Sequence, residues 1–312
     1  MIGTYMSGRM GNQFFRYAYT RAIMFARGDK DKLVFNFNMV YKKDPNDPSF
    51  EDVLKYFNVQ PYETTSHNLI LRYGSLKQIL YFVLYFINVK ILGRILGNSK
   101  KKRKSSYVSL RKNDLMFATE DDCSNMFHLP TSHNVFINGN FENNQYFESI
   151  RNILIKEFQP KYPVRPENKE LYHLICNTNS VCITIRRGDY LSDRYKKSFY
   201  VCNEVYFKKA ISVIKEKIEE PTFFFFSDDI NWVKNNINID GTCYYESGDD
   251  PIWEKIRLMY SCKHFIISNS TFSWWAQYLC SNPNKIVISP NKWLNNGFRS
   301  KLIMDSFITI EV

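Results

Sequence analysis

The sequence predicts an α/β fold built from two domains that face a cleft. Apolar strands alternate with amphipathic helices in the second half of the chain, and the start of the chain repeats the strand–helix–strand order. Three prolines (160, 163 and 166) separate these regions, so we expect domains at 1–160 and 161–312. At 312 residues, 16% of them aromatic, the chain is long enough to build two cores.

The first domain is expected to open with a βαβ unit. Its first strand leads through a glycine loop, residues 7–11, into a long helix that stops at Gly28. Farther along, the apolar spacing of residues 144–158 is typical of one amphipathic helix. The predicted elements of this domain are strands 2–6, 33–37 and 136–137 and helices 12–27 and 144–158.

The second domain shows a continuous alternation of strands and helices. Four consecutive phenylalanines at 223–226 leave no polar face, which indicates a strand buried on both sides of a parallel sheet. Asp249 or Asp250 is expected to cap the helix after Pro251. The predicted strands are 181–185, 222–226, 243–245, 264–267 and 286–288, and the helices are 205–218, 229–235, 252–262 and 271–279.

The positive charge is concentrated in one segment. The net charge is +11, and residues 64–113 contain 11 Lys and Arg with no Asp or Glu, so the rest of the chain is balanced. A local basic patch on a neutral protein does not indicate nucleic-acid binding. Within this insertion an apolar run at 79–87, too short to span a bilayer, precedes basic residues up to 104. The segment 79–104 is therefore either a helix on an anionic membrane surface or a helix packed on its own domain with a solvated basic loop.

The cysteines and histidines favour a cytoplasmic protein without a metal. Seven cysteines form no C-x-x-C pair, and the apolar start of the chain is too short for a signal peptide. The protein would then meet a membrane, if at all, at its inner face. The histidines lack ligand spacing, and Asp29-Lys30-Asp31 precedes its strand, where a metal-binding D-x-D motif would follow one.

Arg186-Arg187-Gly188-Asp189 follows a buried strand and is the strongest local signal. Ligands of parallel sheets bind at the carboxyl ends of strands, and a guanidinium binds phosphate bidentately. One arginine is expected to face the cleft while the other pairs with Asp189. The alternative is a surface ion pair at a turn.

Two further polar segments follow predicted strands. In the first, Asp228 and Asp229 could accept hydrogen bonds from a ribose or base; alternatively Ser227 or Asp228 caps the next helix. In the second, a polar turn precedes a helix whose start could bind an anion, unless it is simply a well-capped buried helix. Of Trp274 and Trp275, one is expected to pack inward and the other to brace the cleft. The residues of this polar turn are Asn269, Ser270, Thr271 and Phe272.

The opening loop is a weaker candidate. It matches neither a Walker loop nor G-x-G-x-x-G. A tight turn at Gly8 and Gly11 would bring backbone amides, Arg9 and Asn12 to the cleft from the first domain.

These segments, in this order, resemble glycosyltransferase family 11, the α-1,2-fucosyltransferases. The matching segments are 8–18, 139–147, 186–190, 226–229 and 262–275. The resemblance implies a GT-B-like fold of two Rossmann-type domains, GDP-β-L-fucose as donor and a terminal β-galactoside glycan as acceptor. It also implies inversion at the anomeric carbon with no metal or other cofactor. Transfer of another GDP-sugar, another linkage, or a non-enzymatic basic membrane-peripheral protein are the alternatives.

The resemblance also assigns roles to residues. Arg186 would bind the β-phosphate, and the 270–272 turn would hold the phosphates beside Arg187 and Asn269. Thr184 stands where the family usually has histidine, and its hydroxyl could donate to a ribose or phosphate. The guanine contact is left open among three acids, and so is the general base between two. The guanine candidates are Asp228, Asp229 and Glu254, and the base candidates are Asp189 and Glu142. Asn12 is a further catalytic candidate, and Gly8, Arg9, Gly11 and Glu142 are expected on the acceptor side.

Overall fold

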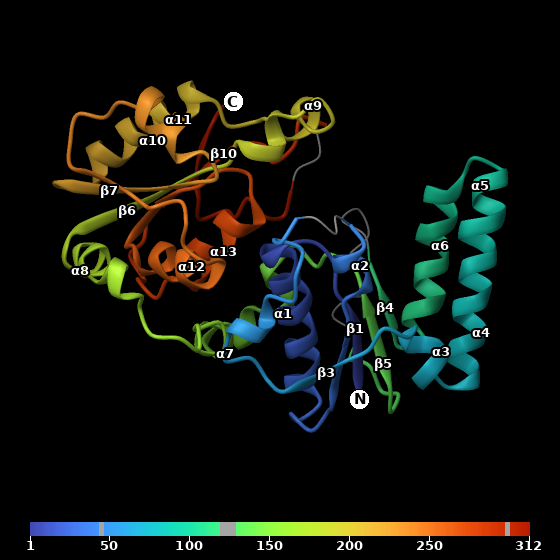
Figure 1. Cartoon of the computed structure of the whole chain (residues 1–312). Helices are drawn as coiled ribbons and strands as arrows, with labels where there is room; N and C mark the ends of the chain where they lie inside the picture. The colour runs from blue at the N-terminus through green and yellow to red at the C-terminus, as the bar shows by residue number, and fades with distance from the viewer. Residues whose placement is uncertain (44–46, 119–128, 297–299) are drawn as a thin grey trace. The chain divides into compact units, whose positions relative to one another are not determined.

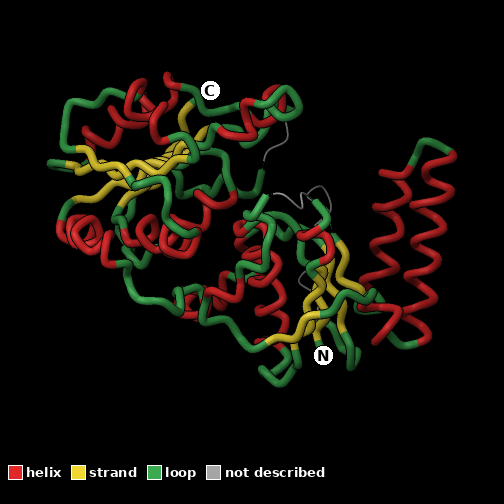
Figure 2. The backbone as a smooth tube through the Cα atoms, viewed as in Figure 1, coloured by secondary structure: helices red, strands yellow, loops and turns green. Residues whose placement is uncertain are grey.

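The computed structural model describes residues 1–43, 47–118, 129–296 and 300–312, and within them the chain forms two compact units. Unit 1 comprises Met1–Lys55 and Val59–Leu154, and unit 2 comprises Tyr56–Asn58 and Ile155–Val312. Each unit contains a parallel β-sheet flanked by helices (Figure 1, Figure 2). The expected α/β class is confirmed.

The sheet of unit 1 has the order β3-β2-β1-β5-β4, with every neighbouring pair parallel. The long helix α1 (Met10–Ala26) follows β1 and buries most of its residues. The strands are β1 Ile2–Tyr5, β2 Leu33–Asn36, β3 Tyr62–Thr64, β4 Leu115–Phe117 and β5 Val135–Asn138; short helices are α2 Asn38–Tyr41 and η1 Leu54–Tyr56.

A helical hairpin connects β3 to β4. After α3 (Leu69–Tyr73), one continuous helix runs through α4 (Leu76–Tyr85), the π-helical segment η2 (Phe86–Leu92) and α5 (Gly93–Ile95). The chain reverses at Gly97, which has a φ of +62°, and returns as α6 (Ser99–Arg111). Figure 1 shows α4 and α6 side by side, next to β4. We call residues 75–111 the helical hairpin.

The helix expected over residues 144–158 is interrupted. Two 3-10 turns, η3 (Asn144–Tyr146) and η4 (Glu148–Ile150), precede the shorter helix α7 (Arg151–Glu157). Asn143 accepts a hydrogen bond from the Gln145 amide through its side chain, which favours a turn over a helix. Phe147, with φ −140°, then lies outside helical geometry while its ring is fully buried. Side-chain burial here overrides the helical spacing.

The sheet of unit 2 has the order β11-β10-β9-β6-β7-β8 and is also parallel throughout. The strands are β6 Asn179–Ile185, β7 Pro221–Ser227, β8 Cys243–Tyr245, β9 His264–Ile266, β10 Val287–Pro290 and β11 Ile308–Ile310. The helices are η5 Pro166–Asn168, α8 Lys169–Asn177, η6 Gly188–Leu191, α9 Lys196–Phe199, α10 Glu204–Lys217, α11 Ile230–Asn236, α12 Ile252–Ser261 and α13 Thr271–Leu279.

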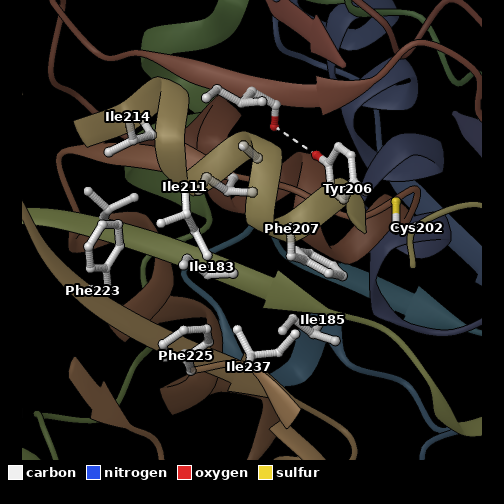
Figure 3. Close-up of a cluster of buried hydrophobic side chains, with 14 of the residues drawn as sticks. Ile183, Ile185, Cys202, Tyr206, Phe207, Ile211, Ile214, Phe223, Phe225 and Ile237 are labelled. Atoms are coloured by element: carbon white, nitrogen blue, oxygen red, sulfur yellow. Dashed lines mark hydrogen bonds between the residues drawn. The ribbon is translucent and has the colours of Figure 1, made fainter. Parts of the chain in front are cut away.

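The core of unit 2 forms where α10 covers β6 and β7. Phe207 and Ile211 pack with the strand residues Ile183 and Phe225 in this cluster (Figure 3). The buried hydroxyl of Tyr206 donates to the carbonyl oxygen of Ile267 at 2.6 Å. This bond satisfies the tyrosine and fixes the chain just after β9, where the polar turn begins.

Two local expectations about unit 2 are wrong. Trp274 and Trp275 are both 0% exposed, so neither braces a cleft; α13 is covered around most of its circumference. Asp250 does not cap α12, whose N-cap is Pro251 without a side-chain hydrogen bond. The Asp250 carboxylate instead accepts hydrogen bonds from the side chains of Arg165 and Asn168, each at 2.7 Å.

Candidate functional site

Three polar segments of unit 2 meet at one edge of its sheet. They follow β9, β6 and β7, which are neighbours in the strand order. Because parallel strands end at the same edge, the Arg186, Asp228 and Asn269 segments are brought together there. This is the arrangement that the sequence predicts for a ligand site.

Arg186 begins the loop after β6 and lies between two carboxylates. Its Nη2 donates to Asp189 Oδ1 at 2.6 Å, and its Nη1 lies 2.8 Å from Asp228 Oδ2. The side chain is 27% exposed. Since a guanidinium has five N–H donors, these contacts fix its plane and leave donors for an anion.

Arg187 has a different environment. Its guanidinium stacks on Trp232, 3.5 Å from the ring centroid, and its Nε lies 3.3 Å from Asp229 Oδ2. We expected one arginine to face the cleft and the other to pair with Asp189; Arg186 forms the pair with Asp189, and Arg187 pairs with Asp229. Asp229 also caps α11 by accepting from the Trp232 amide, so the cap is neither Ser227 nor Asp228.

Gly188 allows the close approach of the Asp228 carboxylate. A Cβ at position 188 would lie 2.5 Å from Asp228 Oδ2, the atom that pairs with Arg186. The other oxygen of Asp228 accepts from the Arg187 amide at 2.9 Å. Asp228 therefore holds both arginines, one through its side chain and one through its backbone.

Asn269 links the polar turn to the arginine loop. Its carbonyl oxygen accepts from the Tyr190 hydroxyl at 3.1 Å, and its buried Nδ2 donates to the carbonyls of Phe199 and Trp293 at 2.9 Å. Cys202 donates to Asn269 Oδ1 at 3.7 Å, and burial raises the pKa of this thiol to about 12. Asn269 thus positions the turn rather than facing solvent.

The start of α13 is suited to an anion. Ser270 is its N-cap but makes no side-chain capping hydrogen bond. The first amides of any α-helix lack acceptors within the helix and carry partial positive charge. Thr271 and Phe272 in this first turn are partly exposed. The start of α13 and the Arg186 guanidinium follow the adjacent strands β9 and β6. A helix start beside a guanidinium is an arrangement suited to binding phosphate groups.

Thr184 and Glu254 have contacts that favour structural roles over ligand binding. Thr184 is 3% exposed, and its hydroxyl accepts from the Ser268 amide at 3.1 Å, joining β6 to the polar turn. Glu254 is fully buried; one oxygen accepts from Arg257 and the other from the Arg165 amide. Asp228 and Asp229 remain the partly exposed candidates for a guanine contact.

The candidates of unit 1 also lie at a sheet edge, after β1. Gly8 has a φ of +75°, and a Cβ there would meet the Asn12 side chain at 2.8 Å, so the loop needs glycine. Gly11 is buried at the start of α1, and Asn12 is partly exposed. Arg9 Nη2 lies 2.8 Å from Asp47 Oδ2. Burial raises the pKa of Asp47, but hydrogen bonds from Ser49 and Arg9 outweigh this effect and lower the pKa to about 2.

Arg16 lies among these candidates of unit 1, and local sequence reasoning did not single it out. It is 6% exposed and donates to the Tyr5 carbonyl and to Asn140 Oδ1, at the ends of the adjacent strands β1 and β5. The pKa of Arg16 is lowered to about 10, because the effect of burial is larger than the opposing effect of the negative charge on the partly exposed Glu142. Arg16 therefore ties the loop of Glu142 to the opening loop. Its signal was a single charge within the apolar and aromatic run at 14–19.

The possible metal ligands among the described residues do not cluster. No group of three His, Cys, Asp or Glu side chains there could hold a metal ion. Asp29 and Asp31 are paired with Arg21 and Arg27. The six cysteines within the described ranges are free, and Cys123 lies outside them.

Similarity to solved structures gives the class of protein. The fold resembles NodZ alpha-1,6-fucosyltransferase from Bradyrhizobium, co-crystallized with GDP, with a TM-score of 0.53, 10% identity and coverage of 92% of this chain and 94% of that one. The same enzyme soaked with GDP-fucose gives a TM-score of 0.51. The chain therefore has the GT-B fold of two Rossmann-type domains.

The sequence comparisons give the family. The model of glycosyl transferase family 11 matches residues 1–309, and the chain belongs to that family. It is 28% identical to the O-antigen biosynthesis glycosyltransferase WbnK of Escherichia coli, over 98% of this chain and 99% of that protein. It is also 35% identical to an alpha-1,2-colitosyltransferase of Escherichia coli, over 50% of this chain and 54% of that protein.

Proposed function

We propose that this glycosyltransferase is a galactoside α-1,2-L-fucosyltransferase. It transfers fucose from GDP-β-L-fucose to the 2-hydroxyl of a terminal β-galactose, with inversion and without a metal, in the synthesis of a surface glycan. The observation that carries the proposal is Arg186, fixed between Asp189 and Asp228 beside the start of α13. Family membership and the α-1,2 linkage in a relative's name support the linkage.

The reaction breaks the bond between the anomeric carbon and the β-phosphate oxygen. The electron pair leaves with the phosphate, the galactose 2-oxygen bonds to the anomeric carbon from the opposite face, and the hydroxyl proton goes to a base or to water. Arg186 and the first amides of α13 would stabilise the charge that develops on the β-phosphate. They supply donors where a divalent ion would otherwise be needed.

The two candidate bases differ in environment. Asp189 is bonded to Arg186 at 2.6 Å, and an ion-paired carboxylate is a weak base. Asp189 is therefore better suited to orient Arg186. Glu142 is partly exposed and belongs to the loop after β5, so it is the better candidate for the proton.

A colitose donor is the second candidate, favoured by the 35% identity to an alpha-1,2-colitosyltransferase. Both sugars would leave from the same phosphate site, so Arg186 and α13 do not separate them. Turnover with each activated sugar, followed by NMR analysis of the product linkage, distinguishes the two donors.

Replacing Arg186 tests the proposal. We expect Arg186→Ala to lower kcat about 100–1,000-fold, as loss of a transition-state donor does, while the melting temperature changes little. Arg194→Ala is the matched control, because Arg194 is an exposed arginine of the same loop region whose guanidinium contacts Tyr195. Activity of the native enzyme should persist in EDTA. Normal turnover in Arg186→Ala, or none in EDTA, would contradict the mechanism.

A further inference from the structure

The helical hairpin exposes a continuous apolar stripe. The side chains at positions i, i+4, i+7, i+8 and i+11 of its first helix share one face. They are 40% to 88% exposed, and the stripe consists of Leu76, Leu80, Val83, Leu84 and Ile87. Ile91, Ile95 and Leu96 extend the exposed apolar surface toward the tip. Soluble surfaces rarely leave so many large apolar side chains in one patch.

The opposite face of the same helix is packed on unit 1. Phe82 and Tyr85 make edge contacts with Phe117 of β4, and Tyr85 lies 5.9 Å from Tyr107 of α6. Gln78 donates to the carbonyl oxygens of Asn113 and Asn134, which anchors the base of the hairpin. We considered that this segment packs on its own domain or lies on an anionic membrane. Packing on its own domain accounts for one face of the helix and leaves the stripe uncovered.

The charge of the hairpin indicates what could cover the stripe. Residues 75–111 contain nine Lys and Arg and no Asp or Glu. Lys90 and Arg94 are exposed beside the stripe, and a shallow hollow of ≈ 630 Å³ on α6 is lined by Lys101, Lys104, Ser105 and Val108. The surface of this hollow is mostly apolar, with lysines at its border. The lysine ammonium groups suit lipid phosphates, whereas the apolar stripe suits acyl chains.

We propose that the helical hairpin docks this enzyme on an anionic lipid bilayer, with the stripe in the acyl boundary and the lysines on lipid phosphates. The inference goes beyond fucose transfer, which it does not require. It would hold the sugar-transfer site near glycans that are assembled on lipid carriers. Bilayer docking also explains why one exposed element carries an apolar stripe on its first helix and a cluster of basic residues on its second.

The hairpin is better suited to lie on the membrane than to cross it. Leu76–Ile95 is long and apolar enough to span a bilayer, and 17% of its most apolar 18-residue stretch is buried within the protein. It is the one helix among the described residues that meets this criterion, and length and composition alone do not show that it spans a membrane. However, Asn88 bonds to Ser106 at 3.0 Å, so the basic helix α6 is packed along this segment. Drawing α6 into hydrocarbon would bury its charges.

Vesicle binding by the full chain tests the proposal. Wild-type protein should co-sediment with vesicles of phosphatidylcholine and phosphatidylglycerol, and much less with phosphatidylcholine alone. The triple variant Leu80→Ser/Leu84→Ser/Ile87→Ser should bind about 100-fold more weakly, because three half-exposed apolar side chains no longer enter the bilayer. The matched control is Met39→Ser/Tyr162→Ser/Val205→Ser, which removes three comparably exposed apolar side chains outside the hairpin and should bind normally.

A charge variant gives an independent measurement. Lys101→Glu/Lys104→Glu should weaken binding to anionic vesicles about tenfold or more, whereas Lys208→Glu/Lys209→Glu on α10 should not. All variants should keep wild-type turnover on a soluble acceptor, which separates this proposal from the proposed function. Equal binding to neutral vesicles, unchanged binding of the triple variant, or no binding by wild type would overturn it. Resistance of the bound protein to carbonate extraction would also overturn the proposal, because it would show a spanning helix. A wild-type dimer that dissociates only in the triple variant would overturn it too, because a second copy would then cover the stripe.

Discussion

Replacing Gly188 with alanine should disable the phosphate site without unfolding the protein. The new Cβ would lie 2.5 Å from Asp228 Oδ2, whereas ordinary van der Waals contact begins at 3.4 Å. Asp228 must therefore move by roughly 0.9 Å, and a shift of that size along its 2.8 Å contact with Arg186 stretches the contact beyond hydrogen-bond length. A misplacement of about 1 Å can lower the rate about 100-fold, so we expect kcat/KM to fall about 10–100-fold.

The stability of the same variant should change little. Arg186 and Asp228 are 27% and 24% exposed, and solvent-screened pairs contribute about 0–1 kcal/mol. Gly28→Ala is the control: Gly28 has a φ of +89° with no atoms near its Cβ position, so alanine there costs about 1–2 kcal/mol of stability and spares activity.

The assay combines donor turnover, GDP binding by calorimetry and urea unfolding. Asp228→Ala and the double variant Gly188→Ala/Asp228→Ala complete a cycle. If the clash with Asp228 is the cause, adding Gly188→Ala to Asp228→Ala should have almost no further effect. Wild-type activity in Gly188→Ala, or simple additivity in the cycle, would refute the reasoning.

Three further predictions follow from buried or paired groups. Asn269→Ala should lower the free energy of unfolding by about 2–4 kcal/mol in urea, since it leaves the carbonyls of Phe199 and Trp293 without their donor; an unchanged midpoint would contradict this. Asp228→Asn removes the carboxylate charge that holds Arg186 at 2.8 Å, so kcat should fall, and an unchanged kcat would contradict the role of Asp228 in orienting Arg186. Burial raises the pKa of Glu246 from 4.5, so the folded state binds its proton more tightly and stability should fall as pH rises from about 4.5 to that raised pKa. In Glu246→Gln, the free energy of unfolding in urea should fall less steeply with pH over this range than in the wild type. An identical pH dependence would exclude Glu246 as the cause of the decline.

The strand-end positions of the candidate site could be predicted from local patterns. Strands β6 and β7 are visible because apolar residues dominate them, four of the five at 181–185 and all four at 223–226, and a polar segment comes next. Parallel strands end together, so the three polar segments had to share an edge. The catalytic and binding roles assigned to their residues remain predictions.

The pairing within the site could not be predicted. Asp228 contacts Arg186 and the Arg187 amide across 41 residues or more of sequence, and no local pattern carries that information. The three-residue strands β3, β4 and β11 were not predicted. Unlike the equally short β8 and β9, they lie outside the regular alternation of strands and helices, and pairing with neighbouring strands defines them. Burial of Trp275 against Phe158 likewise depends on a segment far away in the chain.

The contact between the Gly188 backbone and the Asp228 carboxylate restricts how this loop can vary among related chains. A side chain at 188 and an acid at 228 compete for the same space, so the two positions should change as a pair. A relative that has replaced the glycine should carry a shorter, uncharged residue opposite it and would have to orient its arginine by another group. Covariation of these two positions across an alignment would record that steric exclusion.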